Sequence, residues 1–229
     1  MWNDLKCRDI DQSELEKTSY NQKELTALFV KYNSCKNVEP LNFEEKPERN
    51  SFSLNIRPGV NRSSLDLRDV VRKHDIALEE TGFRIGAEME FTLPFNKNKW
   101  AIIIEPTYQY FKTEKEVPFQ YISPVKVDYR SIEIPIGLRY YLFLNPESKL
   151  FVNASGLYDL PLNSQISFPF VPDVPIKSRN NLAFGLGYKF QDTFSIEFRY
   201  QTAREILGDS KDWNSKYKTL SVLFGYSIF

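Results

Sequence analysis

Residues 131–142, SIEIPIGLRYYL, decide the expected fold, because apolar and polar side chains alternate along them. Ile134 and Leu138 belong to the apolar set, whereas Glu133 and Arg139 belong to the polar set. A period of two places successive side chains on opposite faces of a β-strand. The segment therefore predicts a strand with one apolar face and one polar face.

Seven further segments alternate in the same way, and their apolar stripes begin at Phe52, Phe83, Trp100, Leu150, Leu182, Phe194 and Leu220. The total is even, and each segment is close to the ~10 residues that a tilted membrane-spanning strand needs. Short connections (96–99, 145–148 and 191–192) alternate with long ones (69–81, 112–126, 163–178 and 203–216). This order places the short turns and both termini at one end, which a Greek-key sandwich has no reason to do. We expect an all-β fold, an eight-stranded antiparallel up-and-down transmembrane β-barrel with a short N-terminal helical segment.

The bulk composition excludes two classes of protein. The 30 basic and 30 acidic residues cancel, so no basic surface for nucleic acid is expected. No run of about 18 apolar residues predicts a transmembrane helix. The N-terminus lacks the pattern of a signal peptide. A barrel-forming chain with this start would be a mature form, a fragment, or a sequence with a missing start.

Residues 1–48 form a different region from residues 49–229, which hold the strands. Asn21 and Glu24 have the spacing of a capping box, and apolar residues follow at helical spacing. We expect a small helical periplasmic segment here. A disulfide between Cys7 and Cys35 would stabilise it by about 3 kcal/mol in an oxidising compartment. Two free thiols are the alternative.

The polar stripe carries charges of both signs. In a narrow barrel these side chains fill the lumen and must be paired. We expect a structural salt-bridge network of Arg57, Arg84, Glu88, Glu90, Glu105, Glu133, Arg139, Lys189, Glu197 and Arg199. Glycines on the same stripe are expected to make room for the long arginines. The alternative is a soluble lipocalin-like barrel with the apolar stripe around a ligand, although the many large aromatic side chains would overfill so narrow a cavity.

Aromatic side chains are expected to form two rings at the membrane interfaces. Near the short turns the sequence places Phe95, Trp100, Phe190, Phe194 and Tyr226, and toward the long loops it places Tyr108, Tyr110, Tyr158 and Tyr200.

No nucleotide-binding motif is present, and we predict no catalytic, cofactor or metal site. His74, beside Asp69 and Asp75, is expected to be a solvated loop residue, and a membrane-barrel enzyme built on these three residues is an alternative. The apolar, proline-rich residues 168–175 would either dock a partner or the lipid rim, or fold over the barrel mouth. The expected function is a membrane anchor or a binding and adhesion platform that uses long extracellular loops. Its expected surroundings are outer-membrane lipid and an unidentified extracellular or envelope protein.

The barrel region also resembles the Bacteroidetes outer-membrane β-barrel proteins of the porin-like or PorT-like group. The resemblance lies in residues 83–88, 93–100, 105–108 and 134–140 and in the terminal Phe229. It implies an eight-stranded barrel in the outer membrane of a Gram-negative bacterium, with Phe229 similar to an assembly signal. It implies no ligand.

Overall fold

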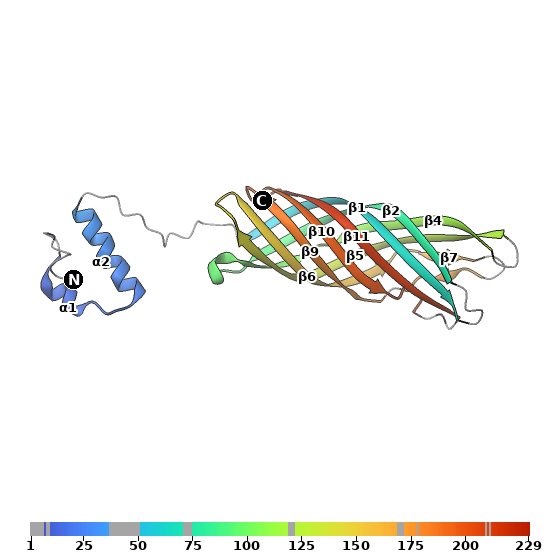
Figure 1. Ribbon diagram of the computed structural model, residues 1–229, viewed down its shortest axis with the longest axis horizontal. Coiled ribbons are helices and arrows are strands. Elements are labelled where there is room, and N and C mark those ends of the chain that lie inside the picture. The colour runs from blue at the N-terminus through green and yellow to red at the C-terminus, as the bar shows by residue number, and fades with distance from the viewer. Residues whose placement is uncertain are drawn as a thin grey trace. The chain divides into compact units, whose positions relative to one another are not determined.

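The computed structural model describes residues 7, 10–36, 51–70, 75–118, 122–168, 172–177, 179–208, 210 and 212–229. The chain divides into two compact units, Met1–Arg49 and Asn50–Phe229, and each is described by itself (Figure 1).

The N-terminal unit contains two helices, α1 (Gln12–Lys17) and α2 (Gln22–Cys35). The Asn21 side chain accepts a hydrogen bond from the Glu24 N–H at 2.9 Å, so Asn21 caps α2 as expected. The Glu24 carboxylate accepts from the Ser19 N–H at 2.5 Å, two residues before the usual capping-box donor. This hydrogen bond, together with a separate side-chain hydrogen bond between Asn21 and the Glu24 carboxylate, holds the pKa of Glu24 below its ordinary value.

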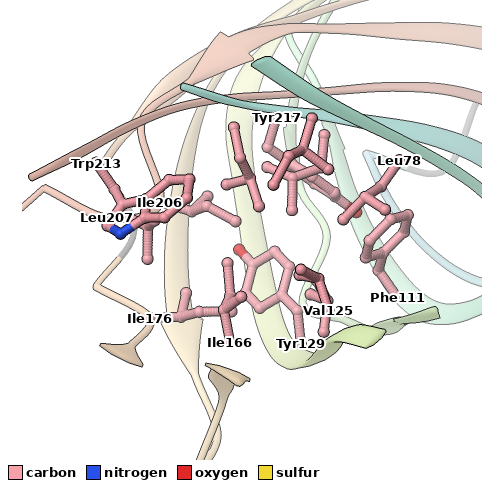
Figure 2. Packing of buried hydrophobic residues seen from close by; sticks show 14 of the residues in the cluster. Leu78, Phe111, Val125, Tyr129, Ile166, Ile176, Ile206, Leu207, Trp213 and Tyr217 are labelled. Atoms are coloured by element: carbon pink, nitrogen blue, oxygen red, sulfur yellow. The ribbon is translucent and has the colours of Figure 1, made fainter. Parts of the chain in front are cut away.

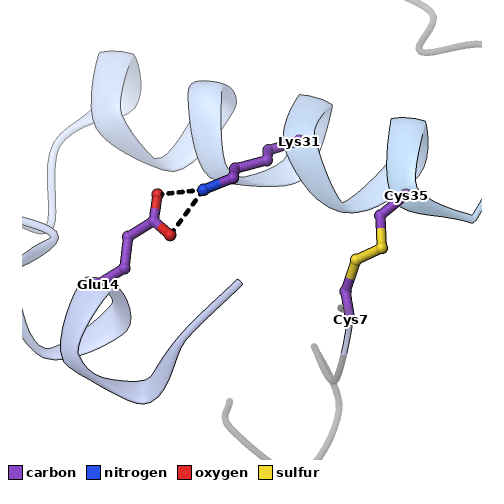
Figure 3. The surroundings of a disulfide bond; sticks show 4 residues. All are labelled: Cys7, Glu14, Lys31 and Cys35. Carbon is purple, nitrogen blue, oxygen red and sulfur yellow. Dashed lines mark hydrogen bonds and ion pairs between the residues drawn. A yellow bond between two sulfur atoms is a disulfide. The ribbon is translucent and has the colours of Figure 1, made fainter. Parts of the chain in front are cut away.

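A small core and a disulfide hold the two helices together. Ile10 and Leu28 are buried, and the predicted Cys7–Cys35 disulfide is confirmed, with a Cα–Cα distance of 6.3 Å. Lys31 of α2 forms an ion pair with Glu14 of α1 at 2.7 Å (Figure 3). In the described part of the chain, no helix is both long and apolar enough to cross a membrane.

The second unit is one antiparallel sheet closed into a ring of eight strand positions, which confirms the predicted fold class. The ring closes because the first strand pairs with both the second and the last. The elements are β1 (Phe52–Asp69), β2 (Asp75–Thr92), η1 (Asn96–Asn98), β3 (Trp100–Ile104), β4 (Thr107–Pro118), β5 (Ile122–Phe143), β6 (Ser148–Pro161), β7 (Gln165–Ser167), β8 (Val174–Pro175), β9 (Asn181–Phe190), β10 (Phe194–Arg204) and β11 (Trp213–Ser227). Strands β3 and β4 occupy one ring position in succession, and β7 and β8 are short additions.

The short connections lie where the sequence predicts them. The turn after β2 contains Asn96, Lys97 and Asn98, all with positive φ, and Gln191 and Asp192 at the β9–β10 turn share this backbone conformation. Asparagine and aspartate adopt the left-handed conformation more readily than most residues, which suits them to tight turns.

Two of the predicted long loops are wrong, since their residues continue the strands. Strands β1 and β2 remain paired up to Arg68↔Asp75, and β4 and β5 remain paired up to Pro118↔Ile122. Side chains continue to alternate between the inner and outer faces of the barrel along these segments. Here, however, the polar side chains face outward and the apolar side chains face inward, and we call this change the exchange of faces. In the sequence, a strand is marked by apolar side chains on one stripe, so each predicted strand ends where its outward stripe becomes polar.

The exchange of faces occurs at one level around this part of the wall. The outward side chains change from Val60 to Arg62 on β1, and Arg62 is paired with Thr81 on β2. On the other hairpin, Tyr110 is paired with Arg130 at the boundary. Below this level the outer surface is apolar, and we call it the apolar band. Above it the wall continues with mostly polar side chains outside, and we call these residues the rim: 62–69, 75–82, 112–116, 124–130 and 213–218.

The rim encloses a hydrophobic core (Figure 2). The core consists of Leu65, Leu67, Ile76, Leu78, Phe111, Val125, Val127, Tyr129, Ile166, Phe168, Ile176, Ile206, Leu207, Trp213 and Tyr217. Phe168 stacks on Trp213 with ring centroids 4.2 Å apart, so the described part of the proline-rich segment folds over the barrel mouth. Its residues 169–171 lie outside the described residues.

Candidate functional site

The apolar band faces outward, and the charged stripe faces the lumen. Phe198 and Leu186, each 57% exposed, stand on the outer surface, whereas Arg57 is 0% exposed on the inner surface. A continuous outward apolar surface of this kind is the property of a barrel surrounded by lipid. The orientation matches the expectation and is opposite to that of a lipocalin-like carrier.

The structure brings all ten predicted lumen residues into one network of ion pairs. Arg57 contacts Glu88 at 2.9 Å and Glu197 at 2.6 Å. Arg139 contacts Glu88 at 2.6 Å and Glu90 at 2.8 Å. The carboxylates are therefore shared between arginines, which joins strands on opposite sides of the ring.

The second half of the network centres on Glu105 and Glu133. Arg199 contacts Glu105 at 2.7 Å. Lys189, which belongs to the first half, lies 3.3 Å from Glu90. Arg84 has longer contacts, at 3.5 Å to Glu133 and 3.9 Å to Glu105.

Several lumen residues lie outside the predicted network. Arg204 contacts Glu133 at 2.6 Å and Asp159 at 3.4 Å, and its side chain is fully buried. Strand β10 has a register shift between Gln201 and Arg204, so the extra residue turns an even-numbered side chain into the lumen. A bulge cannot be read from alternation alone. Tyr141, which donates to Glu90 at 2.5 Å, stands in regular register, and the parity of its position could have identified it.

The buried charges balance. Among the described residues, the ion-pair network of the lumen contains six cations and six anions: Arg57, Arg84, Arg139, Lys189, Arg199 and Arg204 against Glu88, Glu90, Glu105, Glu133, Asp159 and Glu197. Pairing within the protein is what makes burial of such groups tolerable. This network therefore presents no net charge that would attract a permeating ion.

Two glycines show how the lumen is packed. A Cβ on Gly185 would lie 2.3 Å from a carboxylate oxygen of Glu197, and one on Gly187 would lie 2.2 Å from the Phe151 ring. These glycines make room for a carboxylate and an aromatic ring, so the expectation that they would accommodate arginines is wrong at both positions.

Aromatic side chains close the lumen on the side of the short turns. Tyr141 and Phe151 are buried together with Ala101, and the Arg139 guanidinium lies 4.4 Å from the Phe151 ring centre. The Lys149 ammonium lies 4.1 Å from the centre of the Tyr141 ring. The lumen thus passes from an aromatic layer, through the charged network, to the hydrophobic core of the rim.

The three residues of the enzyme alternative do not form a described site. Asp69 is buried at the end of β1, Asp75 is exposed at the start of β2, and His74 lies outside the described residues. Among the residues that the structure describes, no cluster of three or more His, Cys, Asp or Glu side chains is arranged to hold a metal ion.

The comparisons with known proteins identify a fold and no family. No protein-family model and no curated protein matches the chain. Among solved structures, the outer membrane protein OprG from Pseudomonas aeruginosa is similar, with 13% identity, coverage of 78% of this chain and 96% of that chain, and a TM-score of 0.50. Ail, the attachment invasion locus protein of Yersinia pestis, solved in complex with the heparin analogue sucrose octasulfate, has 17% identity, 78% and 100% coverage, and a TM-score of 0.42. Neisserial surface protein A has 11% identity, 76% and 98% coverage, and a TM-score of 0.41. The fold is that of the small outer-membrane β-barrels.

Proposed function

We propose that this protein is an outer-membrane barrel of a Gram-negative bacterium that carries a rigid binding platform outside the membrane and conducts no solutes. The observation that supports this most is the exchange of faces along continuous strands. Below Val60 and Tyr110 the wall is built for lipid, and above them the same strands are built for water. The resemblance to the Bacteroidetes group is part of this proposal, as is a periplasmic place for the N-terminal unit.

The rim has the properties of a preordered binding surface. Its strands are paired and enclose a packed core that includes Leu65, Phe111 and Tyr217. A surface that is already ordered loses little conformational entropy when a partner binds, and this favours affinity. A barrel that served only as an anchor would need no such extension beyond the membrane.

The packed lumen supports the absence of conduction. The aromatic layer, the balanced ion pairs and the rim core lie in series along the axis, and each is built from buried side chains. The refolded protein should therefore give no steady conductance in a planar lipid bilayer. Stable open channels of uniform size would contradict this half of the proposal.

A trimmed barrel tests the platform. Asn61 is paired with Gly82, so a two-residue turn between them can replace residues 62–81. Tyr110 is paired with Arg130, so a second two-residue turn can replace residues 111–129. The trimmed protein should still migrate faster unheated than heated on a gel, as a closed barrel does. Cells displaying the full chain should adhere to a panel of extracellular-matrix glycoproteins and glycosaminoglycans, whereas cells displaying the trimmed barrel should not. Equal adhesion of the two, or none by either, would refute a platform in the rim.

A further inference from the structure

The barrel wall is open between β2 and β4 within the rim. The two strands pair only at Arg84↔Gln109, Ile85↔Tyr108 and Gly86↔Thr107. Farther from the membrane, in the described part of the chain, β2 pairs with β1 and β4 pairs with β5, but the two do not pair with each other. In Figure 1 these hairpins separate toward the loop end of the barrel. We call residues 75–81 of β2 and 112–116 of β4 the seam.

The seam directs main-chain N–H and C=O groups into the opening between β2 and β4 in a known pattern. The Ala87 N–H donates to the Pro106 carbonyl, so the odd-numbered residues of β2 direct their N–H and C=O groups toward β4. In the seam the corresponding residues of β2 are Asp75, Ala77, Glu79 and Thr81, and those of β4 are Lys112, Glu114 and Glu116. Two of these groups have local partners, since the Thr81 N–H donates to the Glu80 carboxylate at 3.1 Å and the Ala77 carbonyl accepts from Lys115. The remaining main-chain groups have no hydrogen bond among the described residues, and such a row is a template for an added strand.

Two other strand edges of the rim are covered among the described residues. β7 pairs with β5 at Lys126↔Ser167. On β11, the Ser215 N–H donates to the Glu205 carboxylate at 2.9 and 3.0 Å. The seam, in contrast, begins directly above Phe83 and Tyr110, two exposed aromatic side chains at the upper edge of the apolar band. An open edge is too costly in lipid but is tolerated in water, so the seam opens as soon as the wall leaves the apolar band.

One side chain crosses the seam among the described residues. The Lys115 ammonium donates to the Ala77 carbonyl at 2.8 Å. A lysine on an edge strand also discourages unspecific pairing. A docking strand would have to displace this contact, so Lys115 acts as a closure that a partner can replace.

The charges of the seam favour a basic partner. Its two strands carry five carboxylates and two lysines. Three of the carboxylates pair with neighbouring strands, in Arg62–Glu79, Arg68–Asp75 and Lys126–Glu114. Glu80 and Glu116 have no ion pair within the described residues. They are available to lysine or arginine side chains of an arriving segment.

We propose that the seam binds an extended, lysine- or arginine-containing polypeptide segment that adds to β2 as an antiparallel strand. Recognition through main-chain hydrogen bonds of this kind is a recurrent mode of peptide binding. Residues 75–81 span about 20 Å, at about 3.3 Å per residue, which suits a segment of about seven residues. The proposal rests on the rim being the binding platform and names the class of its partner.

The test uses the full chain in lipid nanodiscs and a phage library that displays random 12-residue peptides. Selected peptides should be rich in β-branched residues and in lysine or arginine. By NMR, a bound peptide should protect the amide protons of Ala77 and Glu79 from exchange, with little effect on the even-numbered residues, which already face β1. Substitution of Lys115 by alanine should tighten binding.

Proline variants supply the control. Ala77→Pro and Thr81→Pro each remove a donor that faces the seam and leave the β1 ladder intact, and each should weaken binding about fivefold. Ala77→Val and Thr81→Val keep the donors and should bind as the wild type does. Failure to select any peptide, or equal binding by the proline variants, would overturn the proposal. So would pairing of two copies of the chain through the seam, seen by sedimentation. If the proline variants still adhere to matrix ligands while the trimmed barrel does not, the platform stands and the seam proposal fails.

Discussion

Substitution of Glu197 by glutamine tests whether the lumen is a sealed, dry network. The Glu197 carboxylate is 0% exposed and accepts hydrogen bonds from Arg57 at 2.6 Å and Arg199 at 2.7 Å. It also accepts one from Asn153 at 2.9 Å. Glutamine has nearly the same shape, so the change removes the charge and turns one acceptor into a donor that faces guanidinium groups.

The expected cost follows from burial. Removal of one partner of a buried ion pair typically costs about 3–5 kcal/mol, because an uncompensated charge remains. In a chain of this size that corresponds to a decrease in melting temperature of about 6–20 °C. The measurement is urea unfolding of the refolded barrel in lipid vesicles, followed by the difference in gel mobility between folded and unfolded forms.

Two further variants make the result specific. Glu79→Gln removes the carboxylate of the exposed Arg62–Glu79 pair and should leave the unfolding midpoint nearly unchanged. The double variant Glu197→Gln with Arg199→Gln restores the balance of charge, so it should cost less than the sum of its single changes. A Glu197→Gln midpoint as close to wild type as that of Glu79→Gln would mean that water solvates the lumen charges, and the sealed-lumen argument would be refuted.

Three more outcomes are expected. Gly185→Ala should destabilise the barrel by about 1–3 kcal/mol in the same unfolding assay, because its Cβ would overlap Glu197, whereas Gly156→Ala, with no atom within 4 Å of the new Cβ, should be neutral. Reduction of the disulfide should open the N-terminal unit of the full chain to limited proteolysis while the barrel stays folded, and a unit that resists protease equally when reduced would contradict the role given to the disulfide. The folded pKa of Glu24 lies below its unfolded value, so its stabilisation of α2 is present above pH 4.5 and is lost as pH falls through the folded pKa; NMR of the helix from pH 6 to pH 2.5 should show this loss, and Glu24→Gln should remove that pH dependence.

The sequence was sufficient to predict the barrel because alternation is a local property of each strand. The stripe that contains Ile134 and Leu138 faces lipid as expected, and the opposite stripe with Glu133 and Arg139 faces the lumen. The positions of the short turns could be predicted as well, since Asn, Asp and Pro residues mark them.

The parts that escaped prediction depend on which solvent surrounds a strand. Leu65 and Leu67 lie on the same inward stripe as Arg57. A rule that assigns every apolar residue to the outer face would place these two leucines on the opposite face from Arg57, which is incorrect. The strand extensions therefore appeared to be loops. The bulge that turns Arg204 into the lumen depends on pairing with β11, and the sequence of β10 alone contains no signal for it.

The exchange of faces also accounts for the unusual bulk composition. Charged residues make up 26% of the chain and mean hydropathy is −0.44, values that would ordinarily indicate a protein with a fully wetted surface. In the membrane part the charges lie inside and neutralise one another, and in the rim they lie outside, around an apolar core. Each strand such as β1 thus needs polar residues along its whole length, on one face and then on the other. A chain that only crossed the membrane would need charged residues inside the barrel and apolar residues outside. The reverse arrangement in the rim is therefore explained by a role outside the membrane.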